Sequence, residues 1–191
     1  MGGFFGISSK RDCLADVFFG TDYHSHLGTR RGGLAAYDRD IGLQRAIHNI
    51  ENSPFRTKFE HVFEEMQGTS AIGCISDSDP QPLLIRSKLG TYAICIIGIV
   101  NNAEALTEKF FSNDAGHFNA MTGGAVNATE LVAALISRQD NFADGIRFAQ
   151  EVIEGTASTL PHHLSTYQPT FRNIFSPVPD VVLPHPSDCR I

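Results

Sequence analysis

Apolar residues recur along the first 156 positions with two different periods, which together predict a mixture of strands and helices. Short apolar or alternating runs predict strands over residues 4–7, 34–37, 44–48, 70–75, 83–86 and 91–100. Apolar positions three and four residues apart predict helices over residues 10–19, 57–66, 102–111, 129–136 and 142–153. Helices interleaved with several strands indicate a layered sandwich of helices and sheets.

Two of these elements carry a further expectation. Gly20 follows the first helical run and is expected to end that helix. The strand over residues 91–100 is apolar in character along its length, so we expect it to be buried on both faces.

The periodic pattern does not continue into the last 35 residues, 157–191, which hold six of the nine prolines and none of the 17 glycines. Prolines at such intervals interrupt both helix and strand, so we expect neither element there. We therefore divide the chain into a domain over residues 1–160 and an irregular Pro/His-rich tail over residues 161–191. The abrupt change of composition leads to the hypothesis that the tail is read out of frame and that the domain is truncated.

Composition narrows the class of protein. The 191 residues are 42% hydrophobic and 19% charged, which is typical of one globular domain. The net charge of −6 disfavours nucleic acid as a partner. The longest apolar run, residues 93–100, is too short for a membrane span, and the first residues lack the pattern of a signal peptide. We expect a soluble cytoplasmic protein with no membrane partner.

Candidate metal sites are weak. The four cysteines are far apart, and Cys74 and Cys95 lie in apolar runs, so we expect them to be buried as small hydrophobic residues. His24 and His26 lack a third ligand at a suitable spacing and indicate a polar surface loop. The alternating polar residues at 76–79 lack the later glycine and glutamate of a calcium loop and indicate a turn. We therefore expect neither a metal nor a cofactor.

Arg30 and Arg31 lie in a glycine-rich turn at residues 28–33. Such a pair either contacts an anion or forms ion pairs with nearby carboxylates, and ion pairing is the commoner outcome. The chain contains no phosphate-binding loop of the Walker type.

Five segments, taken in order, resemble the motifs of class II glutamine amidotransferases, above all the N-terminal glutaminase domain of amidophosphoribosyltransferases. The start, Met-Gly-Gly-Phe-Phe-Gly-Ile, resembles the family's Met-Cys-Gly-Ile-Phe-Gly-Ile. Residues 29–32 resemble its Gln-His-Arg-Gly turn, and residues 72–79 resemble its Ile-Gly-His-Val-Arg-Tyr-Ser-Thr run. Residues 96–106 resemble its His-Asn-Gly-Asn-Leu-Thr-Asn-Ala-Glu-Glu-Leu run, and residues 126–131 resemble its Ser-Asp-Thr-Glu helix start.

This resemblance implies an α+β fold, the four-layer αββα sandwich of N-terminal nucleophile (Ntn) hydrolases, which the chain would leave incomplete at its C-terminus. It leaves two partners open: a second copy of the chain in a homo-oligomer, and a missing phosphoribosyltransferase domain. No acidic loop of the kind that binds phosphoribosyl pyrophosphate occurs in the sequence.

The resemblance also assigns the catalytic positions. In the family an N-terminal cysteine attacks the side-chain amide of glutamine, and an asparagine side chain together with a glycine N–H stabilises the oxyanion. Here the nucleophile position is Gly2, or Gly3 if the alignment slips by one residue. The oxyanion positions are Ile97 and Gly98, of which only the glycine is retained.

The substrate-binding positions are similarly altered. The family's arginine for the substrate carboxylate falls on Ser76, and its aspartate for the α-amine falls on Ala128, while Arg31 and Gly98 are retained. We therefore expect neither glutamine hydrolysis nor glutamine binding.

Two alternatives remain at this point. The chain is either such a degenerate amidotransferase domain, linked to purine biosynthesis, or a non-enzymatic scaffold or regulatory module that binds a partner protein or a small molecule. A hydrolase that uses Ser8 or Ser9 as nucleophile is disfavoured, because neither residue is N-terminal and no base stands beside it in the sequence.

Overall fold

The computed structural model describes residues 2–113, 116–163 and 172–173. Most of its strands belong to two antiparallel sheets. The first sheet has the order β1-β4-β2-β3, with β1 at Gly2–Ser8, β2 at Arg31–Asp38, β3 at Gly42–Asn49 and β4 at Ser70–Ser76. The second sheet has the order β10-β9-β6-β5, with β5 at Leu83–Ser87, β6 at Gly90–Val100, β9 at Gly155–His163 and β10 at Arg172–Asn173.

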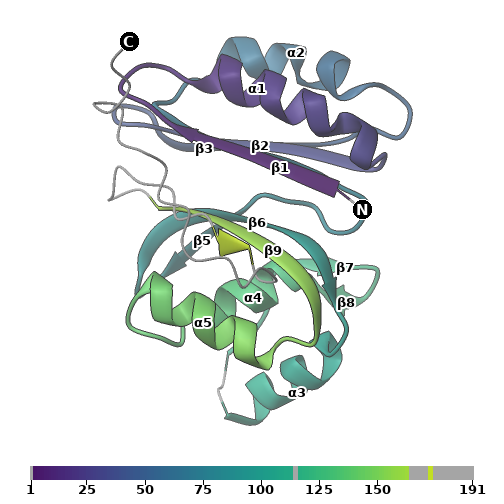
Figure 1. Cartoon of the computed structure of the whole chain (residues 1–191), viewed down its shortest axis with the longest axis vertical. Coiled ribbons are helices and arrows are strands. Elements are labelled where there is room, and N and C mark those ends of the chain that lie inside the picture. Colours follow the sequence, from purple (N-terminus) through teal and green to yellow (C-terminus); the bar gives the residue numbers. More distant parts are fainter. Residues whose placement is uncertain (1, 114–115, 164–171, 174–191) are drawn as a thin grey trace, which may run out of the picture.

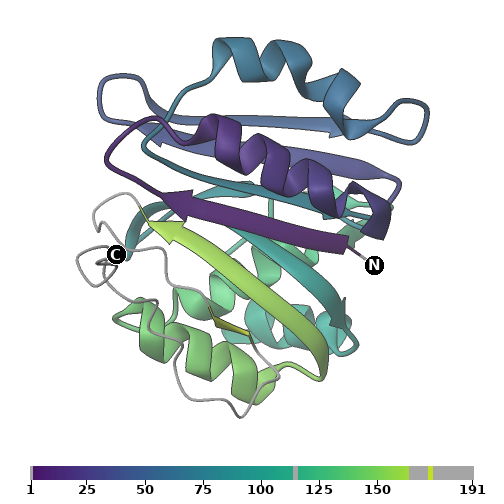
Figure 2. The ribbon, with the colours of Figure 1, turned by 45° about the horizontal axis from the view of Figure 1, so that its top comes forward.

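Helices lie on the outer faces of both sheets, and the inner faces of the sheets pack against each other (Figures 1 and 2). The helices are α1 at Leu14–Tyr23, α2 at Phe55–Glu65, α3 at Ala103–Asn113, α4 at Ala128–Ile136 and α5 at Phe142–Val152. One apolar cluster fills the space between α1, α2 and the first sheet, and another joins α4, α5 and the second sheet. This arrangement confirms the predicted mixture of helices and antiparallel strands.

A third apolar cluster holds the two sheets together, and most of its buried members are small. It contains Ala35, Ile72, Cys74, Ala93, Cys95 and Leu160. Small side chains leave both sheets close to each other while still excluding water. The prediction that Cys74 and Cys95 are buried is confirmed, and burial raises the pKa of the Cys95 thiol well above its ordinary value.

The prediction that Gly20 ends the first helix is wrong, because α1 continues through it to Tyr23. A Cβ placed on Gly20 would overlap the aromatic ring of Phe5 in β1. The glycine is therefore required for the close approach of α1 to the sheet.

The prediction that the whole of the strand over residues 91–100 is buried is also wrong. Residues 92–96 of β6 are buried, but Ile99 is 67% exposed. The cause is the unequal length of the neighbouring strands. β5 pairs with β6 only as far as Ile94, so the end of β6 has a paired neighbour, β9, on one side only among the described residues.

The expectation, from the proline spacing, of neither helix nor strand over residues 157–191 is wrong for β9 and β10, although residues 155–160 do resemble a strand of the amidotransferase family. β9 runs without interruption through Pro161 to His163 and pairs with β6 along that length. A proline is tolerated in a strand where its missing N–H has no ladder partner. In the described part of the chain, β10 pairs with β9 only at Ser158 and Thr159. The side of β9 that faces away from β6 is therefore without a strand partner at Pro161 among the described residues. The rest of the predicted tail, residues 164–171 and 174–191, lies outside the described residues.

Three short elements have no counterpart in the sequence prediction. They are the 3-10 turn η1 at His24–Leu27 and the hairpin of β7, Met121–Thr122, with β8, Ala125–Val126. Each is too short for a hydrophobic period to mark it, and the hairpin turns on Gly123 and Gly124, both of which have positive φ.

The contact between the sheets makes a prediction about stability. We expect Ile72→Ala to lower the free energy of unfolding by about 2–5 kcal/mol, because it leaves a cavity between the sheets. Ile41→Ala is the matched control: Ile41 is 56% exposed in a turn, and its truncation should cost less than about 0.5 kcal/mol. Urea unfolding of both variants measures the difference, and equal losses would contradict the proposed packing.

Candidate functional site

Four of the six site positions lie on the inner faces of the two sheets, near the start of β1. Gly2 is paired in register with Ser76 of β4, and Ser76 is paired on its other side with Arg31 of β2. A Cβ placed on Gly2 would lie 3.0 Å from Cδ1 of Ile97 in β6. Residues that are far apart in sequence therefore meet where the first sheet faces the end of β6.

The pleat of β1 separates the two glycines that were candidates for the nucleophile position. Phe4 of β1 packs into the cluster between the sheets, so Gly2, two residues earlier, lies on the same inner face. A Cβ on Gly3 would instead lie 2.9 Å from the Cγ atom of His24 in η1. Gly2 is thus the glycine that faces the second sheet.

Neither Gly2 nor Gly98 has room for a side chain. A Cβ on Gly2 would overlap the carbonyl oxygen of Ile75 in the neighbouring strand. A Cβ on Gly98 would overlap the carbonyl oxygen of Thr156 in β9, and Gly98 has a φ of +154°. Backbone atoms of adjacent strands therefore occupy the space beside both glycines.

Gln81 ties the site to the second sheet and to α4. Its side chain is 2% exposed. Its Nε2 donates to the carbonyl of Ile96 at 2.7 Å, and its Oε1 accepts from the N–H of Ile96 at 2.8 Å. The same Oε1 accepts from the Thr129 hydroxyl at 2.9 Å. The residue before Ile97 is therefore held in place by a buried amide.

Ala128 is connected to the site through the turn at residues 77–80. Its N–H donates to Oδ2 of Asp79 at 3.0 Å. Asn127 caps the helix by accepting from the N–H of Thr129 at 2.8 Å, and its amide donates to the carbonyl of Pro80 at 3.3 Å. The start of α4 is thus attached to the segment that follows Ser76, and a carboxylate stands beside Ala128.

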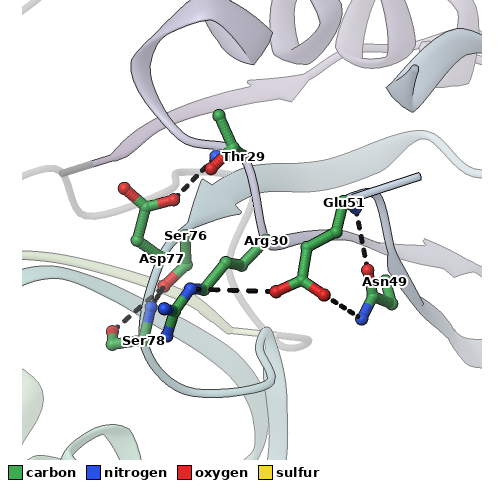
Figure 3. A network of polar contacts seen from close by, with 7 residues as sticks. All are labelled: Thr29, Arg30, Asn49, Glu51, Ser76, Asp77 and Ser78. Atoms are coloured by element: carbon green, nitrogen blue, oxygen red, sulfur yellow. Dashed lines mark hydrogen bonds and ion pairs between the residues drawn. The ribbon is translucent and has the colours of Figure 1, made fainter. Parts of the chain in front are cut away.

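The turn around Ser76 carries a polar network that Figure 3 shows in detail. The buried Ser76 hydroxyl lies 3.1 Å from the Ser78 hydroxyl and accepts from the Ser78 N–H at 3.1 Å. The Thr29 N–H donates to Oδ1 of Asp77 at 2.6 Å. This hydrogen bond is the largest cause that holds the pKa of Asp77 below its ordinary value of 3.8.

On the neighbouring turn, Arg30 lies 3.8 Å from a carboxylate oxygen of Glu51 (Figure 3). The amide of Asn49 donates to the second oxygen of the same carboxylate at 3.1 Å. The prediction that the arginines of this turn pair with carboxylates is confirmed for Arg30.

The described cysteines do not supply a nucleophile. Cys74 and Cys95 are buried between the sheets. Cys13 lies at the start of α1, where burial and the nearby carboxylates of Asp12 and Asp16 raise its pKa to about 11. A thiol with such a pKa is protonated at neutral pH and is a poor nucleophile.

The serines considered as alternative nucleophiles lie away from Gly2. Ser8 is paired with Ser70 at the opposite end of β1 from Gly2. The Ser9 hydroxyl follows that end and accepts from the N–H of Arg11 at 3.2 Å.

His24 and His26 belong to η1, and the ring Nδ1 of His26 lies 2.7 Å from the carbonyl of Tyr23. Within the described ranges, no three His, Cys, Asp or Glu side chains are grouped closely enough to hold a metal ion. A search of the same residues finds no helix with the length and apolar character needed to cross a membrane.

Solved structures share this arrangement. The chain is similar to the glutamine phosphoribosylpyrophosphate (PRPP) amidotransferase of B. subtilis in complex with ADP and GMP, with a TM-score of 0.69 and 24% identity. It is also similar to a structure described as the allosteric regulatory enzyme of purine biosynthesis, with a TM-score of 0.68 and 22% identity. Each match covers 84% of this chain and 35% of the other. The chain shares its fold with part of PRPP amidotransferase.

This likeness agrees with the glutamine amidotransferase domain that the sequence motifs resemble, and it covers about a third of the length of the solved chains. Among family models, none matches the chain. A search of curated proteins also finds no match.

Sequence reasoning missed Gln81 as an organising residue of this region. Gln81 and Pro82 resemble the Gln-Pro that follows the family's Ile-Gly-His-Val-Arg-Tyr-Ser-Thr run, but this resemblance assigns no role to the glutamine. Because its partners are backbone atoms of Ile96 and the hydroxyl of Thr129, its importance is visible only after the chain has folded.

The buried amide of Gln81 predicts a large effect on stability. We expect Gln81→Met to lower the free energy of unfolding by about 2–4 kcal/mol, because buried groups of Ile96 and Thr129 lose their partner. Gln44→Met is the matched control, since it removes one exposed hydrogen bond to the Gln67 carbonyl and should cost less than about 1 kcal/mol. Chemical denaturation checks both values, and a loss at Gln81 no larger than at Gln44 would refute the role assigned to the amide.

The lowered pKa of Asp77 predicts a dependence of stability on pH. Because the folded state favours the ionised carboxylate, its stabilising effect is complete above the ordinary pKa of 3.8 and is lost as the pH falls through the lower folded value. We expect the wild type to melt above Asp77→Asn at neutral pH, and the difference to shrink as the pH falls below that range. Melting temperatures of both proteins across this range test the sign, and a difference independent of pH would contradict it.

Proposed function

We propose that the chain is a glutamine amidotransferase-type domain, related to that of amidophosphoribosyltransferases, which no longer hydrolyses glutamine. In this proposal its layers are those of the four-layer αββα sandwich of Ntn hydrolases. The domain acts within the cytoplasm as a structural or regulatory part of a purine-biosynthesis protein.

The packing around Gly2 is the observation that carries the proposal. The family's nucleophile is a side chain at this position, and here the Ile75 carbonyl and the Ile97 side chain lie where its Cβ would be. A side chain could be accommodated only if β1 moved away from β4, because the overlapping oxygen belongs to the backbone of Ile75. The site therefore lacks a nucleophile and also lacks the space for one.

The surrounding positions support the same conclusion. Ile97 stands where the family has the oxyanion asparagine, and an aliphatic side chain donates no hydrogen bond to an oxyanion. At the position of the carboxylate-binding arginine, the Ser76 hydroxyl is buried and bound to Ser78. At the position of the amine-binding aspartate, Ala128 offers only a backbone N–H, which Asp79 already binds.

The retained residues fit a scaffold role. Gly98 is retained where a neighbouring backbone carbonyl leaves no room for a Cβ, and Arg31 occupies a paired position at the start of β2. The residues that build the backbone of the site have thus been kept, while those that contact substrate have not. A full-length protein with a phosphoribosyltransferase part would then use free ammonia, because this domain releases none.

The alternative, a scaffold or regulatory module without any link to amidotransfer, shares the absence of catalysis. It differs in expecting no phosphoribosyltransferase motifs in the gene beyond residue 160. Translation of the other two reading frames downstream of that residue separates the two proposals.

Loss of catalysis is tested by incubating the purified chain with glutamine and measuring glutamate. We expect no release above a blank without protein, both for the wild type and for Gly2→Cys, because the other substrate contacts are also missing. The PRPP amidotransferase of B. subtilis serves as the positive control of the assay.

Measurable turnover by the wild type would overturn the proposal. Ser8→Ala and Ser9→Ala would then show whether either hydroxyl is responsible. Turnover by Gly2→Cys alone would show that the remaining site is intact, which would contradict the assignment of Ile97, Ser76 and Ala128 as lost positions.

A further inference from the structure

A groove with a positively charged lining follows the open edge of the second sheet. β5 is the last strand of that sheet and pairs only with β6 among the described residues. In an antiparallel pair every second residue directs its N–H and C=O away from its neighbour, so β5 presents unpaired backbone groups at this edge.

The groove has a volume of about 600 Å³ and lies directly along this strand. All five residues of β5 line it. The opposite side is formed by residues 117–120 and by α4, and Arg45 of β3 lies at the side of the first sheet. Its shape therefore follows an extended strand.

The charge of the lining is opposite to that of the whole protein. The chain carries a net charge of −6, yet three arginines line the groove: Arg45, Arg86 and Arg138. The only acidic residue among the described residues of the lining, Glu130, accepts from the backbone N–H groups of Asn119 at 3.0 Å and Ala120 at 2.7 Å. The carboxylate of Glu130 is bound by the wall of the groove, and the described lining as a whole has a net positive charge.

The pleat of β5 divides the groove into two sides. Leu83 and Ile85 pack toward the core under α4, so Leu84 and Arg86 lie on the opposite face of the strand. Arg45 lies on that opposite side, on the strand of the first sheet next to the groove. Phe118 lines the groove from the segment that precedes β7.

We propose that this groove binds an extended acidic segment of a partner protein, which adds to β5 as a further antiparallel or parallel strand. The two sides specify an alternating sequence, with Asp or Glu directed toward Arg45 and Arg86 and apolar residues directed toward Phe118 and α4. Backbone hydrogen bonds to β5 supply affinity, and the alternating side chains supply specificity.

A second copy of the chain fits the groove less well. Pairing of two β5 edges about a two-fold axis would bring Arg86 of one copy near Arg86 of the other, and like charges at such an interface oppose association. This inference does not depend on the loss of glutamine hydrolysis.

The probe is a fluorescein-labelled peptide of alternating Glu and Val, about 6 residues long, which is a usual strand length. Fluorescence anisotropy with the full chain measures its affinity. We expect Arg86→Glu and Arg45→Glu each to weaken binding by about tenfold or more. Arg39→Glu is the matched control, because Arg39 is exposed in the turn between β2 and β3 and does not line the groove; it should change affinity by less than about twofold.

Two further peptides test the mode of binding. A peptide with Lys in place of Glu, and one methylated on alternate backbone nitrogens, should both bind at least about tenfold more weakly. Hydrogen exchange of the β5 amides should slow when the unmodified peptide is bound. Equal binding of the methylated peptide would overturn strand addition, because only charge would then be recognised.

Other outcomes also decide the proposal. No binding of the alternating peptide, or equal weakening by Arg39→Glu and Arg86→Glu, would overturn it. A dimer that forms in the absence of peptide and is abolished by Arg86→Glu would assign the groove to a second copy and would likewise overturn it. Circular dichroism of each variant establishes that it is folded before its affinity is compared.

Discussion

The structure depends on the direct packing of one sheet against the other through small side chains. Alanines and cysteines at the centre of this interface leave no space for a helix or a water layer between the sheets. The close approach sets the position of every other element, since each sheet then has only its outer face left for helices (Figure 2). It also brings the start of β1 against the end of β6, where Gly2 and Ile97 meet.

The close packing of the two sheets also contributes to the lack of space at the candidate site. A catalytic side chain at the start of β1 needs space beside β4 and toward the second sheet, and here the Ile75 carbonyl of β4 and the Ile97 side chain of β6 occupy that space. Gln81 keeps the adjacent part of β6 in register with α4, so the scaffold is preserved. The proposed loss of glutamine hydrolysis requires no change of fold, because the residues that hold the backbone differ from those that would contact substrate.

The site and the groove at β5 lie in different parts of the molecule and arise from different physical causes. The site lies where the start of β1 faces the end of β6, and close contacts with the backbone of neighbouring strands fill the space beside Gly2 and Gly98. The groove lies at a sheet edge, where β5 has no second strand neighbour among the described residues and arginines lie beside it. An edge strand of this kind is a risk for uncontrolled association, and the charge of Arg86 and Arg45 restricts which strands can pair with it.

The local hydrophobic pattern was sufficient to predict the five α-helices of the described residues and the strands before residue 101, because each of these elements buries one regular face. The order of the weak family motifs was sufficient to point to the fold. It was not sufficient to predict that α1 continues through Gly20, that β9 continues through Pro161, or that the end of β6 is exposed. These features depend on the Phe5 ring that contacts Gly20, on the short pairing of β10 with β9, and on the short pairing of β5 with β6. Each is a contact made in the folded structure and not between neighbours in sequence. The sequence by itself determined which side chains stand at the site positions, and so that Gly2 brings no nucleophile. Only the tertiary structure decided that this position has no room for one, because the atoms that fill the space come from β4 and β6.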